Sequence, residues 1–225
     1  MTDPWWDDHP PVLPPDPELE PLHAREYSVR AWKISDDSML LRGAVMDLKP
    51  GAPFAARIEA MGGTDPGGSM GVHHMVVDLV VSYPDLTITD ASVVFETFPQ
   101  PGCPAISAHY RELVGLSIAR GFTHEVRQRF GGPRGCTHTT ALLQAMGPVA
   151  VQCIFSMRHA GAGPVDAPAQ GGGQASWMRD TCHVWAGEGD LWQGVTMGLA
   201  PPKPLPMQRR LRAAGLDPNE VDLRA

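Results

Sequence analysis

The chain lacks several features that would assign it to a familiar class of protein. It has no run of about 18 apolar residues, so we expect no membrane-spanning helix. Its net charge of -7 lacks the basic excess that nucleic-acid binders carry. The acidic N-terminus has no basic segment followed by an apolar stretch, which argues against a signal peptide. We therefore expect a cytoplasmic protein that binds neither nucleic acid nor membrane and keeps its four cysteines reduced.

Motifs of nucleotide and serine chemistry are also missing. The chain has no Gly-x-Gly-x-x-Gly after a strand and no Gly-x-x-x-x-Gly-Lys-Ser/Thr loop, which disfavours NAD-dependent and ATP-dependent reactions. It has no serine nucleophile elbow. It also has no Cys-x-x-Cys knuckle of the kind that structural zinc sites use. The chemistry left open needs either no cofactor or a divalent metal, for which zinc is the first expectation.

Periodicity predicts an α+β fold. Alternating apolar and polar residues indicate four strands in the N-terminal half, at residues 26–34, 39–47, 72–81 and 87–97. The intervening Gly- and Pro-rich stretch has room for a short strand or helical turn near residues 54–61. After Pro99 the apolar spacing becomes helical, and we predict helices at residues 103–118, 123–130 and 139–155. The expected architecture is an antiparallel meander with helices packed on one face.

Two positions in the predicted helices carry specific expectations. Thr123 is a candidate N-cap for the second helix. The pair Gly147 and Pro148 is expected to kink or split the third.

Proline-rich arms flank this predicted fold. Residues 1–24 hold seven prolines together with Trp5 and Trp6, and they predict an extended arm. The arm is either a flexible tail or a segment that docks on a partner subunit, since exposed indoles are costly. We expect a homo-oligomer joined through this arm. Residues 25–200 are predicted to form one α+β domain, and residues 201–225 a Pro-rich, basic tail.

The most informative segment is residues 131–140, Gly-Gly-Pro-Arg-Gly-Cys-Thr-His-Thr-Thr. It places Cys136 and His138 where a glycine-rich turn leads into an apolar helix. Unpaired N–H groups at a helix N-terminus favour negative charge. The turn therefore favours a thiolate, which is either a nucleophile or a metal ligand. We predict Cys136 as the reactive group, with His138 or His73 as its base.

His73 is the stronger candidate of two neighbouring histidines. Adjacent residues of a strand point to opposite faces, so only one of His73 and His74 can join an interior site. His73 shares its face with Met75, Val77 and Leu79, the more apolar set, and that face is expected to be the core face. The alternative is a core histidine that bonds a backbone carbonyl.

Acidic and sulfur-bearing residues complete the candidate site. Asp47 and Glu96 lie late in their strands and are expected to orient a histidine, unless they are surface charges. His183 is a further supporting residue. Cys153, in an apolar run, is expected to serve packing alone, and a packing role is open for the other cysteines too. If a metal binds, the expected ligands are Cys103, Cys136, His138 and Cys182.

Five motifs, in order, resemble those of DUF2889, a bacterial family of unknown function. They are Asp47-Leu-Lys49, Val72-His-His-Met75, Cys103-Pro104 with Leu113-Val-Gly-Leu116, Gly135-Cys-Thr-His138 and Asp180-Thr-Cys-His183. The resemblance spans roughly residues 25–192. It implies a bacterial protein and no particular reaction. His74 stands where the family has an acid and Thr139 where it has leucine, so the specificity of other members is not carried over.

We expect an intracellular catabolic enzyme, a lyase before an isomerase or hydrolase. Acid and base groups suffice for a C–C or C–O elimination. The substrate would be a small apolar or aromatic metabolite in a pocket between the sheet and the helices. The alternative is a non-catalytic, metal-stabilised module that assembles with a partner or carries a ligand.

Overall fold

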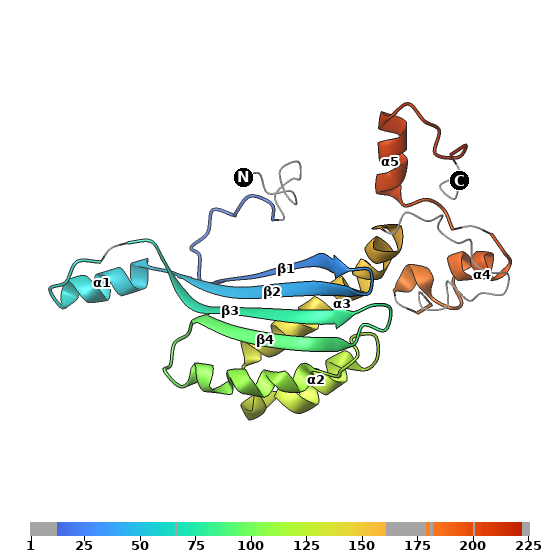
Figure 1. Cartoon of the computed structure of the whole chain (residues 1–225). Coiled ribbons are helices and arrows are strands. Elements are labelled where there is room, and N and C mark those ends of the chain that lie inside the picture. The colour runs from blue at the N-terminus through green and yellow to red at the C-terminus, as the bar shows by residue number, and fades with distance from the viewer. Residues whose placement is uncertain (1–12, 66, 161–178, 181, 200, 222–225) are drawn as a thin grey trace. The chain divides into compact units, whose positions relative to one another are not determined.

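Alternating apolar and polar residues build a four-stranded antiparallel sheet in the order β1-β2-β3-β4. Figure 1 shows the computed structural model, which describes residues 13–65, 67–160, 179–180, 182–199 and 201–221. The strands are β1 (Ala24–Ser35), β2 (Ser38–Pro50), β3 (Ser69–Ser82) and β4 (Ile88–Thr97). The predicted meander is confirmed, and the first three strands extend beyond their predicted ends.

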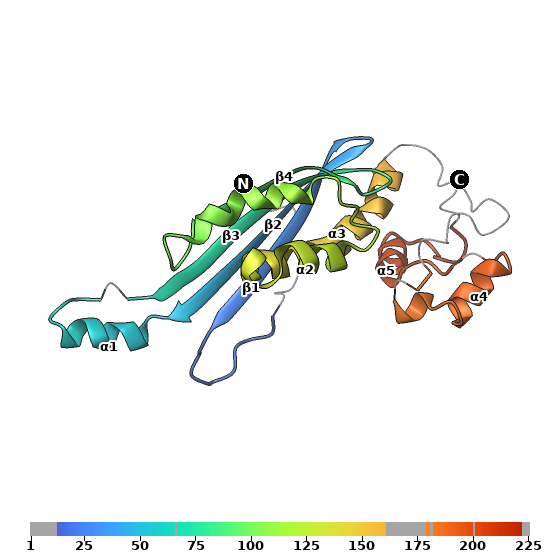
Figure 2. The same cartoon turned by 90° about the horizontal axis from the view of Figure 1, so that it is seen from below.

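The helices that follow the sheet cover one of its faces. They are the 3-10 helix η1 (Cys103–Leu113), α2 (Phe122–Phe130), the short 3-10 turn η2 (Gly132–Arg134) and α3 (Thr137–Ala160). Figures 1 and 2 show η1, α2 and α3 on the same side of the sheet. A further helix, α1 (Ala52–Ala60), lies in the connection between β2 and β3. The α+β class is confirmed.

The first predicted helix is shorter and of a different type. We expected an α-helix over residues 103–118, but η1 has 3-10 geometry and ends at Leu113. The reason is that the following backbone pairs with the start of β4. The N–H of Gly115 donates to the carbonyl of Ile88, and the N–H of Ile88 donates to that of Leu116. These bonds use the N–H of Gly115 and the carbonyl of Leu116, which a longer helix would have needed for its own hydrogen bonds.

The next two helices also correct details of the prediction. The N-cap of α2 is Gly121 and not Thr123, because a glycine accommodates the positive φ of 67° at that turn. α3 begins at Thr137, two residues before the predicted start, and continues through Pro148 without being split. Core packing on both sides of the proline, by Met146 and Ala150, stabilises the helix across the missing hydrogen bond.

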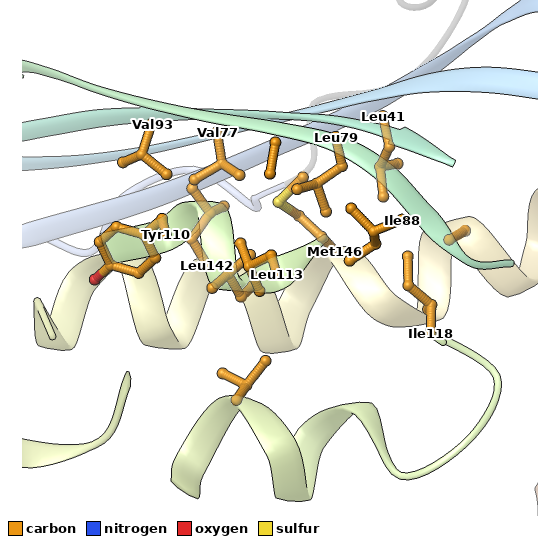
Figure 3. Packing of buried hydrophobic residues seen from close by; sticks show 14 of the residues in the cluster. Leu41, Val77, Leu79, Ile88, Val93, Tyr110, Leu113, Ile118, Leu142 and Met146 are labelled. Atoms are coloured by element: carbon orange, nitrogen blue, oxygen red, sulfur yellow. The ribbon is translucent and has the colours of Figure 1, made fainter. Parts of the chain in front are cut away.

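The core lies between the sheet and α3 (Figure 3). Leu41, Val77 and Leu79 point from the sheet toward Leu142 and Met146 of the helix. The predicted core face of β3 is confirmed, since Met75, Val77 and Leu79 are buried. At Gly43 the layers approach so closely that an added Cβ would lie 2.7 Å from the sulfur of Met146. This packing fixes where the N-terminus of α3 meets the sheet.

Residue contacts group the chain into two units, residues 1–154 and 155–225. The second unit contains the 3-10 turn η3 (His183–Trp185), α4 (Asp190–Thr196) and α5 (Leu205–Ala213). The single domain expected over residues 25–200 stays a prediction. The Trp5–Trp6 arm segment and the low-complexity stretch after residue 160 lie outside the described residues. None of the helices in the described ranges combines the length and hydropathy that crossing a bilayer requires.

Candidate functional site

The centre of the candidate site is Asp47, a buried carboxylate near the end of β2. Its side chain is 2% exposed. Arg25, its register partner on β1, donates from Nε to Oδ1 at 2.6 Å and from Nη2 to Oδ2 at 2.7 Å. The guanidinium holds the pKa of Asp47 well below its ordinary value, against burial, which acts to raise it. Asp47 is therefore an ionised acceptor held in a fixed orientation.

His73 reaches Asp47 across the β2–β3 pairing. Asp47 pairs with His73 and Leu48 with Gly71, so Val72 is the extra residue of a β-bulge. Nδ1 of His73 lies 3.2 Å from Oδ2 of Asp47. The two atoms do not have the angles of a hydrogen bond, and Nδ1 is buried with no hydrogen-bond partner among the described groups. The bulge thus brings Nδ1 of His73 close to the carboxylate but leaves this nitrogen without a hydrogen bond.

The N-terminus of α3 supplies the other two side chains. The carbonyl of Cys136 accepts the N–H of Thr140 at 2.9 Å, which makes Cys136 the N-cap. Its own N–H donates to the hydroxyl of buried Tyr110 at 2.8 Å. His138, one position into the first turn, lies with Nε2 3.0 Å from Oδ2 of Asp47. Its Nδ1 lies 3.8 Å from the sulfur of Cys136.

This geometry selects one protonation pattern for His138. An ionised carboxylate only accepts hydrogen bonds, so Nε2 of His138 carries the ring proton and donates a hydrogen bond to Asp47. Nδ1 is then unprotonated, and its lone pair faces the Cys136 thiol. Burial lowers the pKa of His138, and the neighbouring His73 and Arg25 lower it further, while Asp47 opposes the shift. His138 is thus the central member of a carboxylate–imidazole–thiol relay.

The two imidazoles stack on each other. Their centroids are 3.8 Å apart and their planes differ by 24°. Two positive charges at this separation repel each other, so the stack favours at least one neutral ring. The His73 side chain is 20% exposed and that of His138 is 14% exposed, so both rings are reachable from solvent at the rim of the sheet.

The structure brings together four of the predicted site residues: Asp47, His73, Cys136 and His138. Cys103 is half-buried at the start of η1 and packs against the core. Glu96 is exposed and lies where β4 shifts register against β3. Neither Cys103 nor Glu96 belongs to the Asp47–His73–His138 group that the described residues form.

Two predicted residues lie in the second unit. Cys182 is exposed, and His183 begins η3. Cys153 belongs to the first unit, where it is half-buried against the core, and burial raises the pKa of its thiol.

Sequence reasoning missed the residues that surround Asp47. Arg25 carries the strongest contacts, and Nε2 of His23 lies 3.6 Å from Oδ1. Arg25 is the register partner of Asp47 in the β1–β2 hairpin, so the hairpin register points to it, whereas His23 precedes β1 and has no register partner among the described residues. Tyr110 had no such signal, since its contact with Cys136 joins residues 26 positions apart.

The comparison with known families matches residues 23–152 to a family described as protein of unknown function (DUF2889). The chain belongs to the DUF2889 family. The match includes Asp47, His73, Cys136 and His138 and ends before Asp180–His183, which the sequence resemblance had included. Comparisons with curated proteins and with solved structures gave no match. In this DUF2889 chain, Thr139 beside His138 is buried.

Proposed function

We propose that this DUF2889 protein is an intracellular enzyme that acts on a small metabolite by acid–base chemistry. The observation that supports it is the relay from Asp47 through His138 to Cys136, with contacts of 3.0 and 3.8 Å. A thiol beside an imidazole that a carboxylate orients has the arrangement of an activated acid–base or nucleophilic group. The N-cap position of Cys136 adds the electrostatic effect of the helix N-terminus.

The relay supports an elimination without a cofactor. Transfer of the thiol proton to Nδ1 of His138 gives a thiolate and an imidazolium, which Asp47 stabilises. The thiolate removes a proton from a substrate carbon, and electrons of that C–H bond form the new double bond. The bond to the leaving group breaks, and Nδ1–H protonates that group. Cys136 then again carries a proton and His138 is neutral, so the site is restored.

The position of the relay bears on the substrate. Aliphatic side chains fill the space between the sheet and α3, so the substrate approaches at the rim, where His73 and His138 are partly exposed. Cys136 packs against the apolar core. We therefore retain a small apolar or aromatic metabolite as the proposed substrate class. Four free thiols agree with a reducing compartment.

A second candidate is a non-catalytic, metal-stabilised module. The observation in its favour is the Asp47–His73–His138 group, whose ligand atoms all lie within 4.8 Å of one another. A metal that cannot be removed without unfolding the protein would favour this role over the enzyme.

Alkylation by iodoacetamide tests the relay in the full-length protein kept in a chelator. Peptide mapping measures the rate at each cysteine. We expect Cys136 to react faster than Cys182, an exposed thiol without a described histidine contact. His138→Ala should slow Cys136 about tenfold, because the proton acceptor is lost. Cys136→Ser should remove the fast reaction and leave the circular dichroism spectrum unchanged.

Two controls give the experiment its specificity. Cys153, whose pKa burial raises, should react slowly in every variant. His74→Ala removes the neighbouring histidine on the other face and should leave the rate at Cys136 unchanged. The relay is refuted if Cys136 reacts no faster than Cys182, or if a folded His138→Ala variant reacts at the parental rate.

A further inference from the structure

We infer that Asp47, His73 and His138 form a binding site for a divalent transition-metal ion, with zinc as the first candidate. The site uses two members of the proposed relay together with His73, for which the relay has no role. A metal on these residues goes beyond the proposed acid–base chemistry and rests on one further observation, the position of His73.

The distances suit a single ion. Oδ2 of Asp47 lies 3.0 Å from Nε2 of His138 and 3.2 Å from Nδ1 of His73. An ion with bonds of about 2.0–2.2 Å separates adjacent ligand atoms by about 2.8–3.1 Å in octahedral geometry and by about 3.3–3.6 Å in tetrahedral geometry. Ligand atoms of all three side chains lie within 4.8 Å of one another. The three residues therefore need little rearrangement to surround an ion.

His73 provides the observation that points to a ligand. Its Nδ1 is buried and has no hydrogen-bond partner among the described groups, although it lies close to a carboxylate. Buried polar atoms in folded proteins are rarely left unsatisfied. A metal ion between Nδ1 and Oδ2 would give Nδ1 the partner that it lacks. A β-bulge beside His73 sets this position, and bulges recur next to functional sites.

The donor set indicates the class of metal. Two imidazole nitrogens and one carboxylate oxygen suit zinc, cobalt or ferrous ions, whereas magnesium and calcium prefer oxygen ligands. Arg25 holds both oxygens of Asp47 and so fixes the carboxylate as a ligand. Its positive charge opposes a cation, but its side chain is 36% exposed and water screens the repulsion.

Metal binding would change the tautomer of His138. An ion on Nε2 displaces the proton shared with Asp47, so the ring proton resides on Nδ1, which faces the sulfur of Cys136 at 3.8 Å. Nδ1 then carries the ring proton and no longer offers a lone pair to the thiol.

This ligand set differs from the sulfur-rich set expected from the sequence. The two sets share only His138, so substitutions separate them. Cobalt also separates them, because a thiolate ligand adds a sulfur-to-metal charge-transfer band in the near ultraviolet that nitrogen and oxygen ligands lack.

The test is equilibrium dialysis of the chelator-stripped, full-length protein against Zn²⁺ and Co²⁺, with metal analysis of the protein fraction. We expect one ion per chain, and a fall in affinity of at least about tenfold in His73→Ala and in His138→Gln. His74→Ala is the matched control for His73→Ala and should bind as the parent does. Cys103→Ser and Cys182→Ser should also bind as the parent does.

The outcomes are decisive in both directions. Circular dichroism confirms that each variant is folded, and His138→Gln, on a different element, covers a failure of His73→Ala to fold. Substoichiometric binding, unchanged affinity in the folded histidine variants, or loss of binding in Cys103→Ser or Cys182→Ser would overturn the site. Alkylation of Cys136 is measured in chelator, so a failure of the metal site leaves the relay standing, and the converse also holds.

Discussion

Asp47 is a carboxylate that remains charged while almost fully buried. Two hydrogen bonds from Arg25 and one from Nε2 of His138 take the place of the water molecules that would solvate an exposed carboxylate. Removing the charge leaves a buried arginine contact without its partner, which is costly even when the pair as a whole adds little stability. Arg25 is partly exposed, and this moderates the cost.

We expect Asp47→Asn to lower the free energy of urea unfolding by about 1–3 kcal/mol near neutral pH. The folded pKa of Asp47 is depressed, so its stabilisation is fully present above the ordinary aspartate pKa of about 3.9 and is lost as the pH falls below it. The difference in unfolding free energy between parent and variant should therefore begin to shrink below about pH 5 and continue to shrink as the pH falls toward the depressed pKa of Asp47.

Asp78→Asn is the matched control for that substitution. Asp78 accepts two bonds of 2.6 Å from Arg42, also across neighbouring strands, but this pair is exposed. We expect a loss of less than about 1 kcal/mol. Equal losses in the two variants would contradict the role assigned to burial.

A strand and a helix, β3 and α3, meet at the candidate site. β3 supplies His73 from a bulge, and α3 supplies Cys136 and His138 from its N-cap and first turn. Their meeting point depends on how closely α3 lies against the sheet. Gly43 permits that approach, because Met146 and Leu142 occupy the space that a Cβ would need. A strand residue without a side chain therefore allows the close approach of α3, which carries Cys136 and His138.

We expect Gly43→Ala to destabilise the protein by about 1 kcal/mol, as the methyl group pushes against the Met146 sulfur. In a Met146→Ala background the added cost should be smaller, which a double-mutant cycle by urea unfolding measures.

Gly71→Ala is the control on the neighbouring strand, since an added Cβ there meets nothing within 4 Å. It should leave stability unchanged or raise it by up to about 1 kcal/mol, because alanine loses less backbone entropy on folding than glycine. A stabilised Gly43→Ala variant would show that the layers are not tightly packed at Gly43.

The residues that carry the fold and the candidate site belong to the first of the two units. The buried residues of the hydrophobic core lie between Met39 and Ala150, and the partly buried residues that pack on it lie between Val29 and Ile154. Asp47, His73, Cys136 and His138 lie within the same range, and the family match ends at residue 152. This coincidence indicates that residues 1–160, which retain all of α3, contain what the first unit needs to fold.

We expect a chain truncated after residue 160 to fold and to unfold in one cooperative thermal transition, because its buried apolar cluster is intact. Circular dichroism against temperature measures this. Iodoacetamide should still react fastest at Cys136. A broad, non-cooperative transition would mean that residues after 160 contribute to the core of the first unit.

The sequence by itself determined the secondary structure of the sheet and the face on which His73 lies. Period-two alternation is a local property, and it follows from the chain geometry of a strand. The N-terminal position of Cys136 on a helix was also readable, since glycine-rich turns and an apolar run are local signals. The start of η1 was predicted, but its 3-10 form and its end depend on pairing with β4, which is not local.

Only the tertiary structure decided which charged and sulfur-bearing groups meet. Asp47 and His138 are 91 residues apart, and the strand register, a bulge and the packing of α3 on Gly43 together place them 3.0 Å from each other. The same register brought Arg25 to Asp47, and the start of η1 placed Cys103 against the core, outside the carboxylate–imidazole group. Contacts of this kind depend on side-chain volumes summed over whole elements, and no local pattern encodes them.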